Sequence, residues 1–193
     1  PTFMLEGYEA DDILGTLARQ AAAQGLEVLI VTGDRDALQL VDDHIKVLTS
    51  GRRFSEAIIY DKEAVKQRYQ LCPEQLVDLK ALAGDSSDNI PGVRGIGEKT
   101  AAELLRTYRT LDGIYQHLDE IKNNRVRSAL AEGKDAAYLS RELGRIVTDV
   151  PITLDLNACR AAEFDRRRVV ELFNELEFHS LLKRLPASEP QPA

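Results

Sequence analysis

Residues 84–100 read GDSSDNIPGVRGIGEKT, and they combine a pair of carboxylates with a glycine-rich turn. Asp85 and Asp88 stand three positions apart among turn-forming residues, and glycines follow at positions 92, 95 and 97. Because glycine permits positive φ and a close approach, successive N–H groups of this turn can point at a phosphate at the N-terminus of the next helix. The stretch therefore indicates a metal ion and a phosphate held close together, although Asp85 and Asp88 could equally be plain turn formers.

A second pair of carboxylates follows the apolar run EVLIVT at 27–32. This run is typical of a strand that is buried on both faces of a parallel sheet. Asp34 and Asp36 come directly after it, and in an extended chain their side chains point to the same side. Ligand sites in open α/β sheets lie at the carboxyl ends of strands, so this pair is a candidate metal site. The alternative is that one of the two carboxylates caps the next helix.

A third acidic group opens an amphipathic helix that the spacing predicts over residues 9–24. Glu9, Asp11 and Asp12 could serve only to complement the positive end of the helix dipole. Glu9 and Asp12 would share a helix face, whereas Glu9 and Asp11 would lie about 200° apart. Glu9 and Asp11 can therefore reach one ion only if Glu9 lies in the turn before the helix.

The three acidic groups contain no histidine or cysteine, which favours hard, oxygen-loving cations such as Mg²⁺ or Mn²⁺. Carboxylates gathered in one place repel each other unless cations neutralise them. The usual chemistry of such a site is phosphodiester hydrolysis with two metal ions about 4 Å apart. The predicted metal ligands are Glu9, Asp11, Asp12, Asp34, Asp36, Asp85 and Asp88.

The remaining pattern predicts further strands at 45–49 and 57–60, with residues 51–53 as the turn between them. A short strand is expected at 151–154. Asp61 is expected to cap a helix over 63–69, and Pro73 to open one over 74–83. Further helices are expected at 98–108, 111–118, 126–131, 136–146 and from about 165 to 176. Residues 185–193 are proline-rich and polar, which is typical of a linker or tail.

Charge is divided unevenly along the 193 residues, whose formal net charge is −7. The first 90 residues carry 9 basic and 16 acidic side chains, a balance of −7, whereas residues 91–145 carry 10 and 8, a balance of +2. An acidic protein binds polyanions poorly without specific contacts, so any nucleic-acid contact must be local or assisted by metal cations.

The chain has no signal for export or membrane insertion. Its apolar runs are too short to cross a bilayer, and its N-terminus lacks a basic region followed by an apolar stretch. Cys72 and Cys159 are isolated, without the spacing of a zinc site, and are interpreted as reduced thiols. These features predict a cytoplasmic protein without a membrane partner, and we expect a monomer.

Three motifs together resemble a known family. GYEADD at 7–12, TGDRD at 32–36 and ALAGDSSDNIPGVRGIGEKTA at 81–101 are similar to the 5′-nuclease domain of bacterial DNA polymerase I, which belongs to the flap-endonuclease superfamily. The resemblance covers nearly the whole chain, since LEFHSLL near the C-terminus is similar to the end of that domain. It implies a magnesium-dependent enzyme that removes RNA primers and 5′ flaps from nicked or gapped duplexes, with polymerase domains following the tail.

The resemblance also implies roles for individual residues. Asp34, Asp36, Asp85 and Asp88 would be catalytic. The glycine turn would be a helix–two-turn–helix element that grips the duplex backbone, often around a potassium ion. The residues expected to bind DNA are Gly92, Val93, Arg94, Gly95, Ile96, Gly97, Lys99 and Thr100. Tyr8 and Gln39 fall inside matching motifs and are given no role.

The predicted fold is α/β. A partial parallel sheet with flanking helices over 1–90 forms a PIN-like 5′-nuclease core, and an all-helical helix–two-turn–helix DNA-binding subdomain follows over 91–185, with a tail at 186–193. The family's domain also has a first strand with an essential aspartate, a second metal-binding aspartate and a basic helical arch, none of which precedes Pro1. We therefore expect the given chain to bind metal weakly and to cleave flaps poorly or not at all.

Two other functions remain open from the sequence. The helices of 92–145 could form a noncatalytic module that binds duplex DNA, with the acidic residues serving only as helix caps. A metal-dependent phosphatase is the third interpretation, but it has no nucleophile motif and gives no purpose to the glycine turn.

Overall fold

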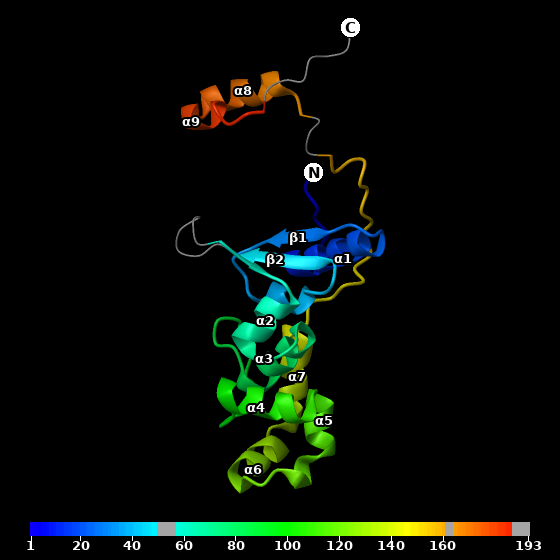
Figure 1. Cartoon of the computed structure of the whole chain (residues 1–193), viewed down its shortest axis with the longest axis vertical. Helices are drawn as coiled ribbons and strands as arrows, with labels where there is room; N and C mark the ends of the chain where they lie inside the picture. Colours follow the sequence, from blue (N-terminus) through cyan, green and yellow to red (C-terminus); the bar gives the residue numbers. More distant parts are fainter. Residues whose placement is uncertain (50–56, 161–163, 187–193) are drawn as a thin grey trace. The chain divides into compact units, whose positions relative to one another are not determined.

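The computed structural model describes residues 1–49, 57–160 and 164–186 of the chain (Figure 1). Its residues divide into two compact units. The larger unit covers residues 2–154, and the smaller one covers residues 155–193 together with Pro1. The division at residue 90 between a nuclease core and a helical subdomain stays a prediction.

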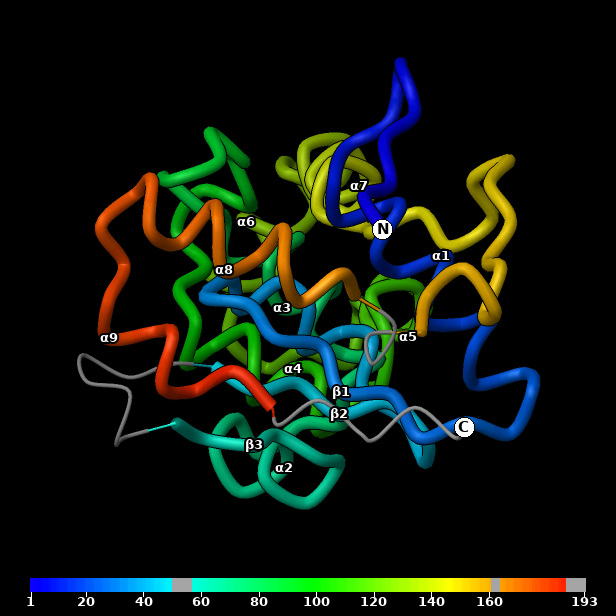
Figure 2. Tube along the Cα trace, turned by 90° about the horizontal axis from the view of Figure 1, so that it is seen from above, coloured from blue at the N-terminus to red at the C-terminus, as the bar shows by residue number. Residues whose placement is uncertain are grey.

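A three-stranded sheet forms one end of the larger unit. The strands are β1 (Val28–Val31), β2 (Ile45–Thr49) and β3 (Ile58–Tyr60), in the order β1-β2-β3 (Figure 2). β1 pairs with β2 in parallel, and β2 pairs with β3 in antiparallel orientation. All three strands lie where the sequence predicts them. The turn predicted at 51–53 lies outside the described residues.

The prediction that the first strand is buried on both faces is wrong. Ile30 points into the core and is 4% exposed, but Leu29 and Val31 on the other face are 48% and 70% exposed. The physical reason is that, among the described residues, β1 pairs along one edge only and is covered on one face only.

Helix α1 (Ala10–Ala23) packs against β1 and β2. On another side of α1, Gly15 leaves room for the side chain of Ile146, since a Cβ at position 15 would lie 2.8 Å from it. Between β1 and β2 the chain forms the 3₁₀ helix η1 (Asp36–Leu40), whose buried leucines 38 and 40 belong to the same core. The helical pattern predicted after Asp36 is therefore a single short 3₁₀ segment.

Residues 62–144 of the larger unit are mainly helical, as predicted. Its elements are α2 (Lys62–Tyr69), η3 (Pro73–Gln75), α3 (Leu76–Ala83), α4 (Glu98–Tyr108), α5 (Leu111–Gln116), η4 (Leu118–Glu120), α6 (Asn124–Glu132) and α7 (Lys134–Gly144). Asp61 caps α2 as predicted, since its carboxylate accepts a hydrogen bond from the Ala64 N–H at 2.8 Å. α3 packs against both α4 and α7, and these helices bury a second hydrophobic core (Figure 1).

Residues 151–154 do not form the predicted strand. Side chains of α1 bind this segment instead. The Gln20 amide donates to the Ile152 carbonyl at 2.7 Å and accepts from the Leu154 N–H at 2.8 Å. One turn earlier, the Thr16 hydroxyl accepts from the Val150 N–H at 3.1 Å. Because these side chains satisfy its backbone groups, the segment runs along α1 without a partner strand.

The smaller unit holds α8 (Arg166–Glu175) and α9 (His179–Leu182). Asp165 caps α8 by accepting from the N–H groups of Arg167 and Arg168, which agrees with the predicted start of the last helix. Among the described residues, no helix has the length and apolar character that a membrane span needs.

Candidate metal centre

Three carboxylates from distant parts of the sequence meet in the larger unit. One oxygen each of Asp36, Asp85 and Asp88 lies within 4.8 Å of the others. Asp36 is the first residue of η1, directly after β1, and the other two belong to the loop after α3. Asp85 and Ile90 close that loop through two backbone hydrogen bonds of 2.9 and 2.8 Å, so both carboxylates of the loop are held on one short turn.

Lys80 lies at the centre of these three carboxylates, and the sequence analysis missed it. Its ammonium nitrogen is 2.5 Å from Asp36, 2.6 Å from Asp88 and 3.0 Å from Asp85. A signal was available in the sequence, because Lys80 is a charged residue in the otherwise largely apolar run LVDLKALA of α3. A charge at such a position is seldom buried without a partner.

The closeness of Lys80 and the three carboxylates shifts the pKa values of several of these groups. Burial raises the pKa of Asp36 despite its hydrogen bond with Lys80. The hydroxyl of Ser87, followed by the Lys80 ammonium, lowers the pKa of Asp85 to about 2. Burial alone would lower the pKa of Lys80, but its hydrogen bonds to the three carboxylates outweigh burial and raise it. The cluster thus joins three carboxyl groups to a single ammonium group of opposite charge.

Asp11 and Asp34 lie near this cluster but are not members of it. Burial, followed by the negative charges of Asp34 and Asp36, raises the pKa of Asp11. The Asp34 carboxylate accepts a hydrogen bond from the Asp36 N–H at 2.9 Å and so shapes the turn before η1. Among the described residues, the group of three carboxylates that converge contains neither Asp11 nor Asp34.

Glu9 and Asp12 form hydrogen bonds that stabilise the start of α1. They form a capping box at the start of α1, in which the Asp12 carboxylate accepts from the Glu9 N–H at 3.3 Å. The other oxygen of Asp12 accepts from the Val147 N–H at 2.8 Å. Asp12 thus continues the row formed by Thr16 and Gln20 along α1, and its helix face differs from that of Asp11.

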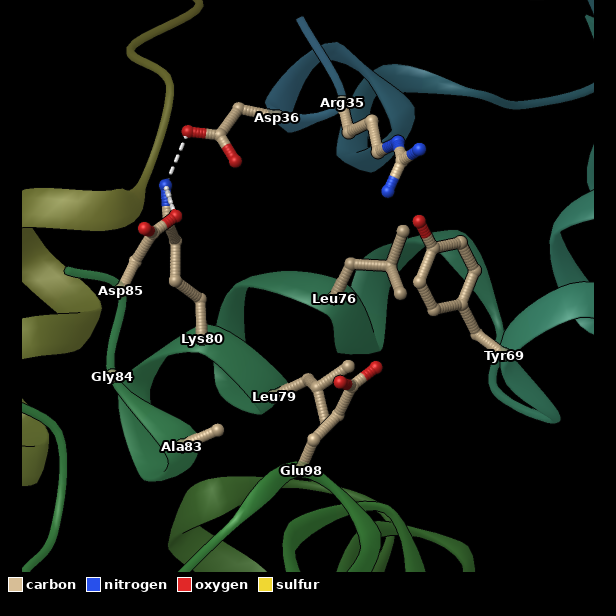
Figure 3. A pocket seen from close by; sticks show the side chains of 10 residues that line it. All are labelled: Arg35, Asp36, Tyr69, Leu76, Leu79, Lys80, Ala83, Gly84, Asp85 and Glu98. Carbon is tan, nitrogen blue, oxygen red and sulfur yellow. Dashed lines mark hydrogen bonds and ion pairs between the residues drawn. The ribbon is translucent and has the colours of Figure 1, made fainter. Parts of the chain in front are cut away.

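A cavity of about 380 Å³ adjoins the cluster (Figure 3). Lys80, Asp36 and Asp85 lie at one end of the view, and Tyr69 and Arg35 lie at the other. Apolar side chains of α3 form the wall between them. The lining residues are Arg35, Asp36, Tyr69, Leu76, Leu79, Lys80, Ala83, Gly84, Asp85 and Glu98.

The glycine turn folds back onto the end of α3. The Gly92 N–H donates to the Ser140 hydroxyl at 3.0 Å, and the Val93 N–H donates to the Leu82 carbonyl at 2.8 Å. The Ile96 N–H donates to the Val93 carbonyl, and the side chains of both residues are 3% exposed. Arg94, Gly95, Gly97 and Lys99 are exposed, and Thr100 is partly buried. The surface of the turn is thus offered by Arg94, Gly95, Gly97, Lys99 and Thr100, whereas Gly92, Val93 and Ile96 hold it in place.

Gln39, to which the sequence analysis gave no role, ties η1 to the end of α7. Its amide donates to the Gly144 carbonyl at 3.0 Å, and its carbonyl accepts from the Ile146 N–H at 3.0 Å. Because η1 begins at Asp36, this tie fixes one carboxylate of the cluster relative to the helices.

Two family models match the chain in succession. Residues 1–70 match the 5′-3′ exonuclease N-terminal resolvase-like domain, and residues 71–167 match the 5′-3′ exonuclease C-terminal SAM fold. The chain is 49% identical over 199 residues to DNA polymerase I of Chloroflexus aurantiacus, covering 100% of the chain and 21% of that protein. It is 43% identical to DNA polymerase I of Bacillus subtilis, covering 95% of the chain and 21% of that protein. The chain thus spans about a fifth of the length of these relatives.

The fold is also similar to that of a solved structure. A T5 5′-exonuclease superposes with a TM-score of 0.66 at 24% identity, covering 77% of the chain and 59% of that structure.

Proposed function

Because the chain belongs to the 5′-3′ exonuclease family, we propose that it takes part in magnesium-dependent hydrolysis of DNA at 5′ ends and 5′ flaps, including the removal of RNA primers. The observation that supports this function best is the convergence of Asp36, Asp85 and Asp88 within 4.8 Å beside an open cavity. Helix caps have no need to come together from two distant parts of the sequence, so the convergence of Asp36 with Asp85 and Asp88 disfavours a module that only binds DNA.

The residues at the cluster fit a hard divalent cation. Asp36, Asp85 and Asp88 would be the ligands, and Asp11 and Asp34 lie close enough to add negative charge at a second position. Oxygen-only ligands favour Mg²⁺, with Mn²⁺ as an alternative. When bound, such ions lower the pKa of the attacking water and stabilise charge on the phosphate. A T5 5′-exonuclease structure with bound divalent zinc ions is consistent with a metal at this fold.

The chain's own residues would hold and orient the DNA. The exposed backbone of Gly95 and Gly97 at the N-terminus of α4 can approach a phosphate, and Lys99 adds a positive charge nearby. We assign the contacts to the DNA backbone to Arg94, Gly95, Gly97, Lys99 and Thr100. A potassium ion at the 92–100 turn is part of this proposal. A T5 exonuclease solved with DNA and metal ions supports a nucleic-acid partner for this fold.

The cellular setting belongs to the proposal as well. The relatives named DNA polymerase I extend far beyond the matched region, so polymerase domains on the same polypeptide are the proposed partners. We propose a monomer that acts in the cytoplasm.

The test compares cleavage with DNA binding in one pair of variants. The substrate is a 5′-flap duplex, with Mg²⁺ or with a chelator, and the protein is assayed as the 193-residue chain and with the N-terminal segment of a relative added. The variant combines Asp34→Asn with Asp85→Asn. The charge-matched control combines Glu63→Gln with Glu74→Gln, two exposed residues outside the cluster. A nuclease loses magnesium-dependent cleavage in the double variant and keeps its DNA affinity. Unchanged cleavage, or no cleavage by any version of the protein, would refute the proposal.

A further inference from the structure

The Lys80 ammonium pairs with all three proposed metal ligands. An ammonium group has three N–H donors, and three carboxylates surround this one at 2.5–3.0 Å. The three carboxylates are those that converge as candidate ligands. A cation that belongs to the protein therefore already lies where they meet.

The rest of the Lys80 side chain is held so that the ammonium stays in this place. The side chain is 11% exposed. Its stem runs past Gly144 at the end of α7, where a Cβ would lie 3.3 Å from Cδ and 3.7 Å from Cγ of Lys80. The absence of a side chain at position 144 thus leaves room for the stem. This packing places Lys80 in the cluster as part of the folded core, unlike a surface lysine that samples many rotamers.

Charge and size show that a divalent ion and the ammonium compete for this place. The three carboxylates carry three negative charges, and Lys80 neutralises one of them. Mg²⁺ needs oxygens at 2.0–2.1 Å, so the same oxygens cannot also keep the Lys80 ammonium at their centre. The cavity of about 380 Å³ beside the cluster gives the lysine head a place to move.

We infer that Lys80 is an internal counterion: it fills the carboxylate cluster when no metal is bound and gives up these hydrogen bonds when a divalent cation enters. The inference rests on the proposed function, because it takes Asp36, Asp85 and Asp88 as the ligands. Lys80 would keep the metal-free site assembled and would moderate the affinity for the metal. Its role is that of a positioning residue, since it acts through the carboxylates.

The first experiment measures Mg²⁺ binding by calorimetry and thermal unfolding with a chelator, on the whole chain. Lys80→Met removes the charge and keeps much of the stem. Lys62→Met is the matched control, because Lys62 also pairs with an aspartate, Asp43, that is not one of the three clustered carboxylates. We expect Lys80→Met to bind Mg²⁺ on the order of tenfold more tightly. Its Tm without metal should fall, and its rise in Tm on adding Mg²⁺ should exceed that of the wild type.

The second experiment uses the wild-type chain, so it does not depend on whether the variant folds. A water-soluble acylating reagent labels lysines with and without Mg²⁺, and peptide mass spectrometry gives the extent at each site. Labelling of Lys80 should rise several-fold when Mg²⁺ is present, whereas labelling of Lys62 should stay the same. Displacement by the metal predicts this rise because the reagent needs a free amine.

The outcomes separate the two proposals. If wild-type protein binds Mg²⁺ but Lys80→Met binds it no more tightly, or Lys80 labelling does not change, the counterion role is refuted and the nuclease proposal stands. If wild-type protein binds no Mg²⁺ at all, both are refuted.

Discussion

One carboxylate oxygen of Asp78 accepts a hydrogen bond from the backbone N–H of Leu111 at 2.8 Å, across 33 positions of the sequence. Asp78 belongs to α3, and Leu111 is the first residue of α5. Both residues are buried. The first N–H groups of a helix have no hydrogen-bond acceptor within that helix. The Asp78 carboxylate on α3 therefore supplies an acceptor for the first N–H of α5. The bond thus joins the helix that carries Lys80 to the rest of the helical core.

Removing this acceptor should destabilise the protein. In Asp78→Ala the buried Leu111 N–H is left without a partner, which costs about 1–3 kcal/mol of the free energy of unfolding. Asp78→Asn keeps an acceptor oxygen at the same place and should cost less. Urea unfolding of both variants measures the difference. Equal losses for alanine and asparagine would mean that the hydrogen bond contributes nothing and that packing alone decides.

The same residue predicts a pH dependence of stability. Burial raises the pKa of Asp78 above its ordinary value of 3.8, although the Leu111 hydrogen bond lowers it in part. The folded state therefore keeps this proton to higher pH than the unfolded state. The stability that Asp78 contributes is fully present below 3.8 and is lost as the pH rises through the pKa of the folded protein.

Comparing the wild type with Asp78→Asn isolates the effect of this titration, since asparagine does not ionise. The difference in free energy of unfolding, wild type minus Asp78→Asn, should fall as the pH rises from 3.8 through the raised pKa of Asp78 in the folded protein. Urea unfolding at several pH values gives this difference directly. A difference that stays constant or grows over this range would show that the carboxylate is not the titrating group.

The glycine turn predicts an order of stabilities for three alanine variants. Gly92 has φ +62°, and a Cβ there would overlap the backbone of Gly84 and Ala83. Gly92→Ala should therefore cost about 3 kcal/mol or more. Gly95 has φ +91° but open space around it, so Gly95→Ala should cost only the strain of a left-handed residue, about 1–2 kcal/mol.

Gly97 provides the control for this series. Its φ of −93° suits any residue, and nothing lies within 4 Å of an added Cβ, so Gly97→Ala should change the stability by less than about 0.5 kcal/mol. If Gly97 serves close approach to a phosphate, this variant stays folded and still binds duplex DNA more weakly. Urea unfolding and fluorescence anisotropy with a labelled duplex test the two parts. If the Gly97→Ala variant is stable and binds DNA with full affinity, Gly97 does not contact the DNA.

Elements whose pattern reflects local geometry were predictable from the sequence. α4 has the predicted bounds, because Ala101, Leu104 and Leu105 recur at helical spacing and face the core. The strand at 45–49 also has its predicted bounds. Residues 151–154 have the alternating apolar pattern of a strand, but the sequence does not show that Gln20 and Thr16 replace a partner strand there.

The site was predictable in its chemistry but not in its arrangement. Acidic residues after a strand and in a turn indicated oxygen ligands, and Asp36, Asp85 and Asp88 do converge. Lys80 was not predicted because its partners lie up to 44 positions away and only the packing of α3 against η1 brings them together. Helical spacing does separate the faces of Asp11 and Asp12, but it does not show that Asp12 accepts a hydrogen bond from Val147, 135 positions away.

Asp11 and Asp12 are neighbours in the sequence, but we expect one to affect Mg²⁺ binding and the other to affect stability. Burial and the charges of Asp34 and Asp36 act on Asp11, whereas Asp12 accepts from the N–H groups of Val147 and Glu9. Asp11→Asn removes negative charge beside the proposed metal and leaves these bonds intact. It should weaken Mg²⁺ binding several-fold, since affinity follows the number of charged ligands, with the stability unchanged.

Asp12→Ala should lower the stability and leave Mg²⁺ binding nearly unchanged. It leaves the Val147 N–H and the start of α1 without their acceptor, which costs about 1 kcal/mol, typical of a lost helix cap. The Mg²⁺ affinity should stay within about twofold of the wild type, because Asp12 points along the other helix face. Calorimetry and urea unfolding on both variants check the pair. If Asp12→Ala abolished Mg²⁺ binding while stability stayed intact, Asp12 would be a metal ligand and its bond to Val147 would have to break when the metal binds.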